Sequence, residues 1–548
     1  MNASAISFSS ENSMSMNRQH GILCDNTSAT EVCKSTVLDL ENQSGDIKES
    51  ISQENEIPKN NMPVVMTGIL LTTFLSALDS TIVTTAVPTI MHDLSGKVDY
   101  SWIGSAYTLA LTAVLPLLGV ASDMLGRKVV LYSSILCFLL GSALCGASNS
   151  MIMLVICRAV QGVGAGGITS LCFIVISDIT SLANRSFYTS FIASVWGIAS
   201  VIGPLLGGII CQGTTWRWIF FINLPTGGIS IAILVFFLNV PVHDRTTFRH
   251  FLVTFDFIGL TTCIVGSVLI LLGLSIGATN NDWVRVNVLV YIIVGVILLI
   301  VCAFCETKTT RNQILPTFMF DSLSKCALLF TVFLHNYNYM LFDYYLPEFY
   351  QNVKGDTPIF SGIHIIAPAF LVSLFSFLTG MFIKKTNNFM IPMYIGWLFM
   401  TAGMGALTDL NYSSSVGKII ALSIIYPIGS GCLFLPPLLA AQASTPVHVM
   451  AIVTSVVMFV RSIGGSVGVI VGKVVYSQTL AALLGKNANT LSNMSYEQIN
   501  TFPQDERSQL LDKMGKAYRM NWIVGTIISG IGLLCLLTVR MNGASKQK

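Results

Sequence analysis

The sequence predicts an all-α membrane protein in which fourteen transmembrane helices form two six-helix bundles with two helices inserted between them. Three observations lead to this fold class. The chain is 53% hydrophobic and only 10% charged, whereas an average soluble protein has roughly 25% charged residues. Fourteen mostly apolar stretches each reach the ~20 residues that a bilayer-spanning helix needs. A weak internal repeat relates the first six stretches to the last six.

These stretches divide the chain into regions that we expect in the following order. They are a disordered cytoplasmic tail (1–63), rich in Ser, Asn and Glu, the first six-helix bundle (64–240), a linker with two extra helices (241–325), the second bundle (326–540) with a long outer loop (477–520), and a cytoplasmic tail (541–548). The predicted spans are 64–88, 101–121, 128–148, 151–177, 187–210, 218–240, 255–277, 286–305, 326–350, 360–383, 389–409, 418–441, 449–476 and 521–540.

The charged residues of the short loops predict the orientation in the membrane. An even number of spans puts both termini on one side, and the side with more Lys and Arg is the cytoplasm. With cytoplasmic termini, the short inner loops hold ten Lys and Arg residues and the short outer loops hold five. We therefore expect a multi-pass protein of the plasma membrane or the vacuolar membrane. Asn411 and Asn493 then lie in outer N-x-S sequons and are candidate glycosylation sites.

The repeat between the two bundles is faint, but its members keep the same order. Asp79 and Pro88 in the first span correspond to Asp343 and Pro347 in the ninth. The other matching pairs are Gly162-Val-Gly164 with Gly429-Ser-Gly431, Gly203 to Gly208 with Gly464-Gly465, and Gly119 to Lys128 with Gly380 to Lys385. Such internal symmetry is typical of membrane proteins built from repeated bundles, so spans seven and eight are the insertion.

Several stretches together resemble one known family. They are Gly119-Val-Ala-Ser-Asp123-Met-Leu-Gly126-Arg127-Lys128, Leu78-Asp79 to Pro88, Arg158-Ala-Val-Gln161 to Gly167, Gly197 to Gly208, Trp216 to Asn223-Leu-Pro225, Tyr344 to Pro347 with Val353-Lys-Gly355, and Phe459-Val-Arg461 to Gly465. The set is similar to signatures of the major facilitator superfamily, and within it to the fourteen-span drug:proton antiporter branch of fungal type. This branch is related to multidrug and vacuolar basic amino acid transporters. The resemblance covers about residues 64–540 and implies the major facilitator fold and solute transport.

The charged turn between spans two and three is the first candidate site. The resemblance implies that Gly119, Asp123, Gly126, Arg127 and Lys128 form an inner gate, in which Arg127 holds Asp123. Span thirteen is expected to begin near Ser444-Thr445-Pro446, an N-cap followed by proline. A helix N-terminus stabilises a nearby carboxylate by about 0.3–1 kcal/mol, so contact with Asp123 would latch the two halves. The alternative is that Arg127 and Lys128 only anchor the topology.

Two charges within the first bundle are candidates for proton coupling. A charge near the bilayer centre costs at least about 2.5–3.5 kcal/mol, so Asp79 must face a cavity or a partner. Asp79 could bind and release a proton or attract a cationic solute. It could instead make only a structural hydrogen bond. The resemblance makes Arg158 a candidate proton relay, and a fixed counter-charge for Asp79 is the other interpretation.

Glycine and proline in span five form a third candidate site. Gly203, Pro204, Gly207 and Gly208 are expected to bend this helix and thin its surface. The resemblance identifies them with the antiporter hinge, and close helix packing is an alternative that does not exclude it.

Polar residues in spans nine and thirteen are candidates for the substrate pathway. His335, Asn338 and Asp343 follow one another along span nine, and Arg461 lies in the middle of span thirteen. Polar side chains on a spanning helix should face the protein interior. Asp343 could add a second protonatable group or lie near the outer interface. His335 would titrate near physiological pH if accessible, or act as a packed hydrogen-bonding group.

The sequence thus predicts a proton-coupled secondary active transporter that exports small organic solutes, drug-like or cationic, from the cytoplasm by alternating access. A vacuolar basic amino acid transporter is the alternative, and a transporter-like receptor that does not cycle is a third possibility. We expect no enzyme, because the sequence contains no phosphate-binding G-x-x-x-x-G-K-[ST] motif and no nucleophile–base set. The expected partners are a small-molecule substrate, protons and membrane lipid, without cofactor, metal or nucleic acid, and the chain is expected to be a monomer.

Overall fold

The computed structural model describes residues 58–94, 101–241, 255–280, 283–308, 313, 315–446, 449–484 and 496–539, and the elements in these ranges are helices. Most of the predicted tail 1–63, the tail 541–548 and the sequon at Asn493 lie outside them.

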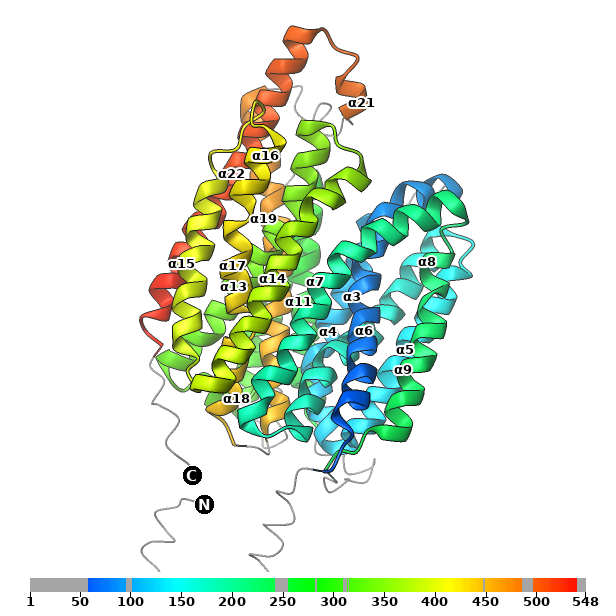
Figure 1. The fold of residues 1–548 in the computed structure, drawn as a ribbon, viewed down its shortest axis with the longest axis vertical. Helices are drawn as coiled ribbons and strands as arrows, with labels where there is room; N and C mark the ends of the chain where they lie inside the picture. Colours follow the sequence, from blue (N-terminus) through cyan, green and yellow to red (C-terminus); the bar gives the residue numbers. More distant parts are fainter. Residues whose placement is uncertain are drawn as a thin grey trace, which may run out of the picture. The chain divides into compact units, whose positions relative to one another are not determined.

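The helices gather into two groups, which Figure 1 shows in blue to teal and in green to red. The first group contains α3 (Met62–Asp93), α4 (Ser101–Leu125), α5 (Arg127–Gly146), α6 (Met151–Ile179), α7 (Leu182–Gly213), α8 (Trp218–Phe221) and α9 (Asn223–Phe237). The second group contains η1 (Thr317–Met319), α13 (Leu323–Phe349), η2 (Tyr350–Lys354), α14 (Pro358–Thr386), α15 (Met390–Leu407), α16 (Val416–Ser423), α17 (Ile425–Leu433), α18 (Pro436–Ala443), α19 (Met450–Leu484), α21 (Tyr496–Ile499) and α22 (Gln504–Leu536). We refer to these groups as the first and second bundles.

The spans agree with the predicted fold class. Among the described residues, thirteen helical stretches are long and apolar enough to cross a membrane. The remaining predicted span, the ninth, is α13, which has 27 residues. It packs inside the second bundle against α19 and α22, and His335, Asn336 and Asn338 are among its buried residues. These polar residues lower its average apolarity, which explains why length and packing identify this span better than composition.

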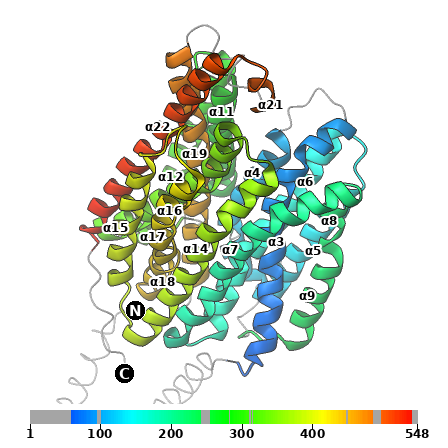
Figure 2. The same ribbon diagram turned by 45° about the horizontal axis from the view of Figure 1, so that its top comes forward.

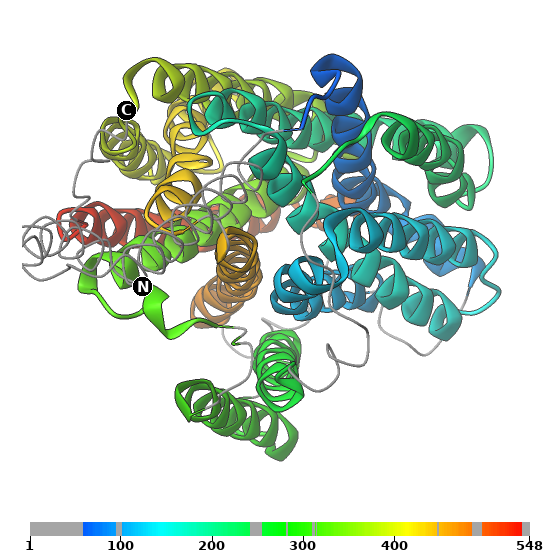
Figure 3. The same ribbon diagram turned by 90° about the horizontal axis from the view of Figure 1, so that it is seen from below.

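The inserted helices are α11 (Phe257–Asn280) and α12 (Val286–Lys308), which pack against each other. Seen from below, they lie apart from the main group of helices (Figure 3), and Figure 2 places them beside the second bundle. Of the two, α11 contacts both α4 and α19. The pair therefore touches both bundles from outside.

Three boundaries differ from the sequence expectation. Span twelve is interrupted, since α17 ends at Leu433 and α18 begins at Pro436, where two prolines cannot donate backbone hydrogen bonds. The expected outer loop 477–520 is partly helical, because α19 continues to Leu484 and α22 begins at Gln504. The helix N-terminus proposed at Ser444-Thr445-Pro446 is also wrong: Ser444 ends α18, and α19 begins at Met450, one residue after the start of the predicted span 449–476.

The two bundles meet along two helix pairs, α7 with α14 and α4 with α19. We call the end that carries the turn between α4 and α5 the Gly126 end. The opposite end is the Trp216 end, where the Trp216 indole donates a 2.9 Å hydrogen bond to Asp93 at the end of α3. Both helix pairs run between these two ends. Any site between the bundles is therefore bounded by the two helix pairs.

Candidate functional site

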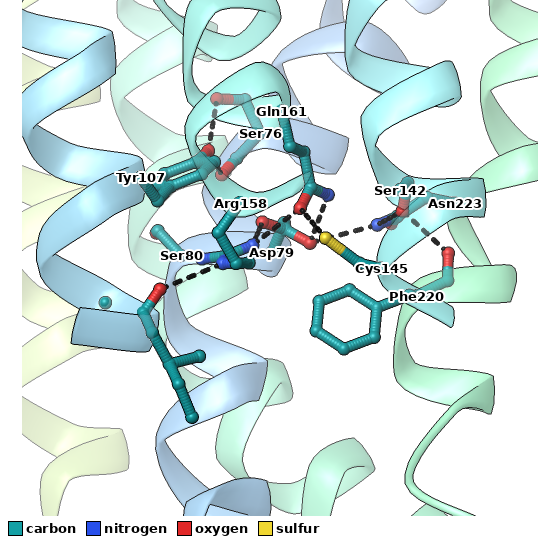
Figure 4. A network of polar contacts seen from close by, with 12 residues as sticks. Ser76, Asp79, Ser80, Tyr107, Ser142, Cys145, Arg158, Gln161, Phe220 and Asn223 are labelled. Atoms are coloured by element: carbon teal, nitrogen blue, oxygen red, sulfur yellow. Dashed lines mark hydrogen bonds and ion pairs between the residues drawn. The ribbon is translucent and has the colours of Figure 1, made fainter. Parts of the chain in front are cut away.

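Asp79 and Arg158 form a fully buried ion pair in the first bundle (Figure 4). Asp79 is 0% exposed and Arg158 is 1% exposed. The Arg158 Nη1 donates to Asp79 Oδ2 at 2.5 Å. The sequence singled out both residues separately, and the fold of α3 against α6 brings them together.

Two amides complete the carboxylate's hydrogen bonds. Gln161 Nε2 donates to Asp79 Oδ1 at 2.7 Å, and Asn223 Nδ2 donates to the same oxygen at 3.1 Å. Gln161 lies one turn after Arg158 on α6, and Asn223 begins α9. Sequence reasoning missed both as site residues, although each is a polar residue inside an apolar stretch. That pattern was the available signal.

The guanidinium is held from the other side by neutral groups. Its Nε donates to the Ile103 carbonyl at 3.1 Å, and its Nη1 also donates to Gln161 Oε1 at 2.7 Å. The Tyr107 ring lies 4.3 Å from the guanidinium carbon, a cation–π distance. We call Asp79, Tyr107, Arg158, Gln161 and Asn223 the Asp79 cluster. Its charges cancel, and three of its members, Arg158, Gln161 and Asn223, donate hydrogen bonds to the Asp79 carboxylate.

Such a cluster can act as a proton-operated switch. Protonation of Asp79 removes its charge, so the ion pair with Arg158 is lost and the guanidinium is left in a low-dielectric interior. A buried charge without its partner costs about 3–5 kcal/mol. Proton binding here would therefore favour a rearrangement of α3 relative to α6 rather than a local adjustment. Because the pair is neutral, Asp79 also offers no net negative charge to a cationic solute.

The charged turn at the Gly126 end is built around Arg127. Gly126 has φ 97°, a left-handed conformation that favours glycine and lets α5 start directly after α4. Arg127 forms ion pairs with Asp123 at 2.5 Å and Asp178 at 2.7 Å. The expected interaction of Arg127 with Asp123 is therefore present as an ion pair. Asp178, at the end of α6, is a further member that sequence reasoning missed. In the described part of the chain, Lys128 makes no ion pair.

One turn deeper, the two bundles touch closely. Gly119 faces α19 so tightly that an added Cβ would lie 2.9 Å from the Ser455 Cβ and 3.0 Å from the Ala451 carbonyl oxygen. Ser170 and Ser455 hydroxyls are 2.9 Å apart. Asp123 lies one helical turn further toward the Gly126 end, which is the level at which α19 begins at Met450. Helix α19 thus begins at Met450 and not at Ser444-Thr445-Pro446, and a latch between Asp123 and the start of this helix remains a proposal.

The glycines of span five divide between two surfaces. An added Cβ at Gly203 would lie 2.8 Å from the Thr81 Cβ, and one at Gly207 would lie 2.5 Å from the Ile82 carbonyl oxygen, both on α3. An added Cβ at Gly208 would instead lie 3.7 Å from Ile359 of α14. Pro204 lies inside α7. Gly203 and Gly207 therefore allow close packing within the first bundle. A hinge at the surface facing α14 stays a prediction.

The polar residues of α13 do not form a single face. His335 Nε2 lies 3.2 Å from the Ser430 carbonyl oxygen of α17. Asn338 instead turns toward α22, where its Nδ2 donates to Ser529 Oγ at 3.2 Å. Asp343 is half-buried and forms no ion pair among the described residues. Arg461 meets the same region as His335, because its Nη2 donates to the Phe434 carbonyl at 2.6 Å.

Two remaining expectations concern modification and metals. Asn411 is exposed in the loop before α16, where its Oδ1 accepts hydrogen bonds from Ser413 at 2.8 Å and Ser414 at 3.0 Å. Glycosylation of this sequon stays a prediction. Across the described ranges, no group of three or more His, Cys, Asp and Glu side chains is placed to hold a metal ion.

A membrane protein with two helical bundles meeting at paired helices, and with charged residues buried between its spans, has the architecture of a secondary transporter. The chain belongs to the Major Facilitator Superfamily, whose model matches residues 69–469. It is therefore an integral, multi-pass membrane transporter of this family, and the resemblance seen in the sequence is confirmed.

Relatives and solved structures support this assignment. An uncharacterized MFS-type transporter of Schizosaccharomyces pombe is 45% identical over 92% of this chain and 85% of its own length. The efflux pump dotC of Dothistroma septosporum is 34% identical over 88% of this chain and 85% of its own length. The solved structure of the proton:xylose symporter XylE has a TM-score of 0.57 at 12% identity, covering 86% of this chain and 94% of that one. The last comparison concerns the fold alone.

Proposed function

We propose that the protein is a proton-coupled secondary active transporter that exports small organic solutes by alternating access. The observation that carries the proposal is the Asp79–Arg158 pair, which is fully buried and neutral. Similarity to the fungal efflux pump dotC supports the direction of transport. We place both termini in the cytoplasm, so the Gly126 end is the inner end, and the membrane is the plasma membrane or that of the vacuole.

The cycle follows from the contacts already described. In the arrangement of this structure, Gly119 packs against Ser455 at the inner end. A proton that reaches Asp79 from outside discharges the carboxylate, ends its ion pair with Arg158 and weakens the hydrogen bonds that Gln161 and Asn223 donate to it. The freed guanidinium favours a different packing of α3 and α6, which opens the contact at Gly119. The proton then leaves toward the cytoplasm, and the pair forms again.

Vesicles containing the purified protein test the coupling without knowledge of the natural substrate. A panel of cationic dyes, arginine, lysine and organic acids would be screened for accumulation under an imposed pH gradient. Asp79→Asn mimics the protonated carboxyl group. It should abolish accumulation driven by the gradient while retaining exchange of solute across the membrane without a gradient. Gradient-driven accumulation equal to the wild type would overturn the role of Asp79.

The alternative of a vacuolar basic amino acid transporter rests on one observation. The second bundle contains fixed charges of both signs, Arg461 and Asp343, which an amino acid would match. Accumulation of arginine or lysine in vacuolar vesicles, with no export of dyes or acids by the same preparation, would favour it. Solute binding without exchange would instead identify a receptor that does not cycle.

A further inference from the structure

The second bundle buries a cation for which the described residues provide no acid partner. Arg461 is 8% exposed and lies about 17 Å along α19 from its start at Met450, given the rise of 1.5 Å per residue. In the part of the chain that the structure describes, no carboxylate lies within ion-pair distance of it, whereas Arg158 pairs with Asp79. Charges at this depth are normally paired or line a solute or ion pathway.

The groups that hold the Arg461 guanidinium are neutral. Its Nη2 donates to the Phe434 carbonyl, and its central carbon lies 4.5 Å from the centroid of the Phe434 ring. This carbonyl is available because α17 ends at Leu433 and the prolines that begin α18 donate no backbone hydrogen bonds. Within the described residues, the Nε of Arg461 has no hydrogen-bond acceptor. The side chain is thus oriented, but its charge has no acid partner among the described residues and its Nε–H donor is not satisfied.

The surroundings of the guanidinium favour an organic anion. His335 is 1% exposed, and its ring lies edge-on to the Phe434 ring with the centroids 6.4 Å apart. Tyr339 lies one turn along α13 from His335, and the centroids of these two rings are 6.4 Å apart. These residues supply hydrogen-bonding groups and aromatic walls but no negative charge at neutral pH. We call Arg461, His335, Tyr339 and Phe434 the Arg461 site.

The Arg461 site lies next to a contact between the two bundles. The neighbouring residue Ser462 has its hydroxyl 2.6 Å from that of Thr112 on α4. This contact is deeper in the membrane than the close approach at Gly119, which faces residues about two to three turns earlier on α19. A solute held between the bundles would therefore reach Arg461 just beyond the inner contact.

We propose that the Arg461 site binds the acidic group of the transported solute, so that the substrates carry a carboxylate or a similar organic oxyanion. The guanidinium is the side chain best suited to bind a carboxylate through paired, charge-assisted hydrogen bonds. The aromatic walls would accept a ring attached to the acid. This inference rests on the proposed transport function and specifies its substrate class. It departs from the cationic solutes expected from sequence, because Arg158 neutralises Asp79.

Binding to the detergent-purified protein tests the inference directly. The probes are benzoate and 1-naphthoate, their methyl esters, benzylamine and arginine, each titrated while the unfolding temperature is followed. We expect at least one aromatic carboxylate to bind more tightly than its ester and than benzylamine. Arg461→Gln should weaken that binding about tenfold or more, equivalent to about 1.4 kcal/mol, while the ester's affinity changes less than about twofold.

Two further variants separate binding from a structural role of Arg461. Arg461→Lys retains the charge and should recover part of the affinity for the carboxylate. Ser529→Ala removes a buried hydroxyl from the same bundle, on the α22 side of α13, and should leave carboxylate binding unchanged. Preference of the wild type for arginine over benzoate would assign the acidic group to an amino acid, with Asp343 facing its amine.

The inference would be overturned if no carboxylate of the panel bound more tightly than its ester. Equal weakening of acid and ester by Arg461→Gln would also overturn it, because the guanidinium would then only support the end of α17. Failure of the pH gradient to drive transport of an acid that does bind would contradict the proposed coupling and leave this site intact.

Discussion

The two bundles bury arginine in opposite ways. In the first, Arg158 is paired with Asp79, and two amides complete the carboxylate's hydrogen bonds. In the second, Arg461 rests on a carbonyl and an aromatic ring and keeps its positive charge. A closed, neutral pair responds to the arrival of a proton, whereas an open cation responds to the arrival of an anion. This difference is the basis for our proposal that coupling resides in the first bundle and solute binding in the second.

The largest expected effect comes from breaking the closed pair. Arg158→Gln leaves Asp79 either as a buried charge without a counter-charge or forced to bind a proton, so it should reduce folding stability by about 3–5 kcal/mol. The yield and unfolding temperature of the purified protein would measure this loss. Adding Asp79→Asn should recover part of it, because the double variant has no stranded charge. Stability of Arg158→Gln equal to the wild type would contradict the closed pair.

The corresponding substitution in the second bundle, Arg461→Gln, should reduce folding stability much less than Arg158→Gln. Arg461→Gln removes a charge-assisted hydrogen bond of about 1.5–3 kcal/mol but also removes the penalty of a buried charge without an acid partner. We expect the two terms to offset, with a net change within about 1 kcal/mol in the same unfolding assay. A loss as large as that of Arg158→Gln would show that Arg461 has a counter-charge after all.

The contact between the bundles can be perturbed with a matched control on one helix. Gly119→Val would place carbon atoms against Ser455 and the Ala451 carbonyl, and such overpacking costs about 1–3 kcal/mol. It should shift the protein toward states open at the inner end, measured as faster thiol labelling of a cysteine introduced at Ser455. Gly104→Val is the control, because nothing lies within 4 Å of an added Cβ there. Equal labelling of both variants would contradict the inner closure.

A smaller effect is expected at the edge of the Asp79 cluster. Asn223→Ala removes one hydrogen bond to Asp79 and leaves the ion pair, so stability should fall by about 1 kcal/mol. The unfolding temperature of the purified variant would measure this loss. An unfolding temperature equal to the wild type would show that the Asn223 amide does not help to hold the carboxylate.

The smallest effect concerns the sequon on the proposed outer side. Asn411→Gln should leave transport unchanged, because Asn411 is exposed and bonds only within its own loop. If the loop faces the lumen of the secretory pathway, the variant should migrate faster than the wild type on a gel, and enzymatic removal of N-glycans should abolish the difference. An unglycosylated Asn411 would remove one argument for the orientation.

Sequence reasoning was most successful for residues whose free-energy cost of burial in the membrane does not depend on their neighbours. Asp79 and Arg158 were identifiable because any charge within an apolar span needs an explanation. A counter-charge role of Arg158 for Asp79 was one of two interpretations of the sequence, and choosing between them required knowing how α3 packs against α6. Asn338 and His335 lie three residues apart, yet they face different helices. Which neighbouring helix each side chain faces depends on how α13 is rotated about its own axis. The sequence alone does not give this rotation.

The start of α19 illustrates another limit. Ser444-Thr445-Pro446 has the residues of a helix N-terminus, yet Ser444 bonds backward to the Ala441 carbonyl and ends α18. Serine can serve either end of a helix through local hydrogen bonds, so composition alone does not decide between them. The fold class was more secure because it rests on many spans at once.

The most direct test of the account measures both variants in one vesicle preparation, using the carboxylate of the panel that binds most tightly. Transport would be followed under an imposed pH gradient over a range of solute concentrations. Asp79→Asn should abolish gradient-driven accumulation without changing the half-saturating concentration for exchange. Arg461→Gln should raise that concentration about tenfold and retain accumulation at saturation. If either variant lost both properties together, coupling and binding would not be divided between the two bundles.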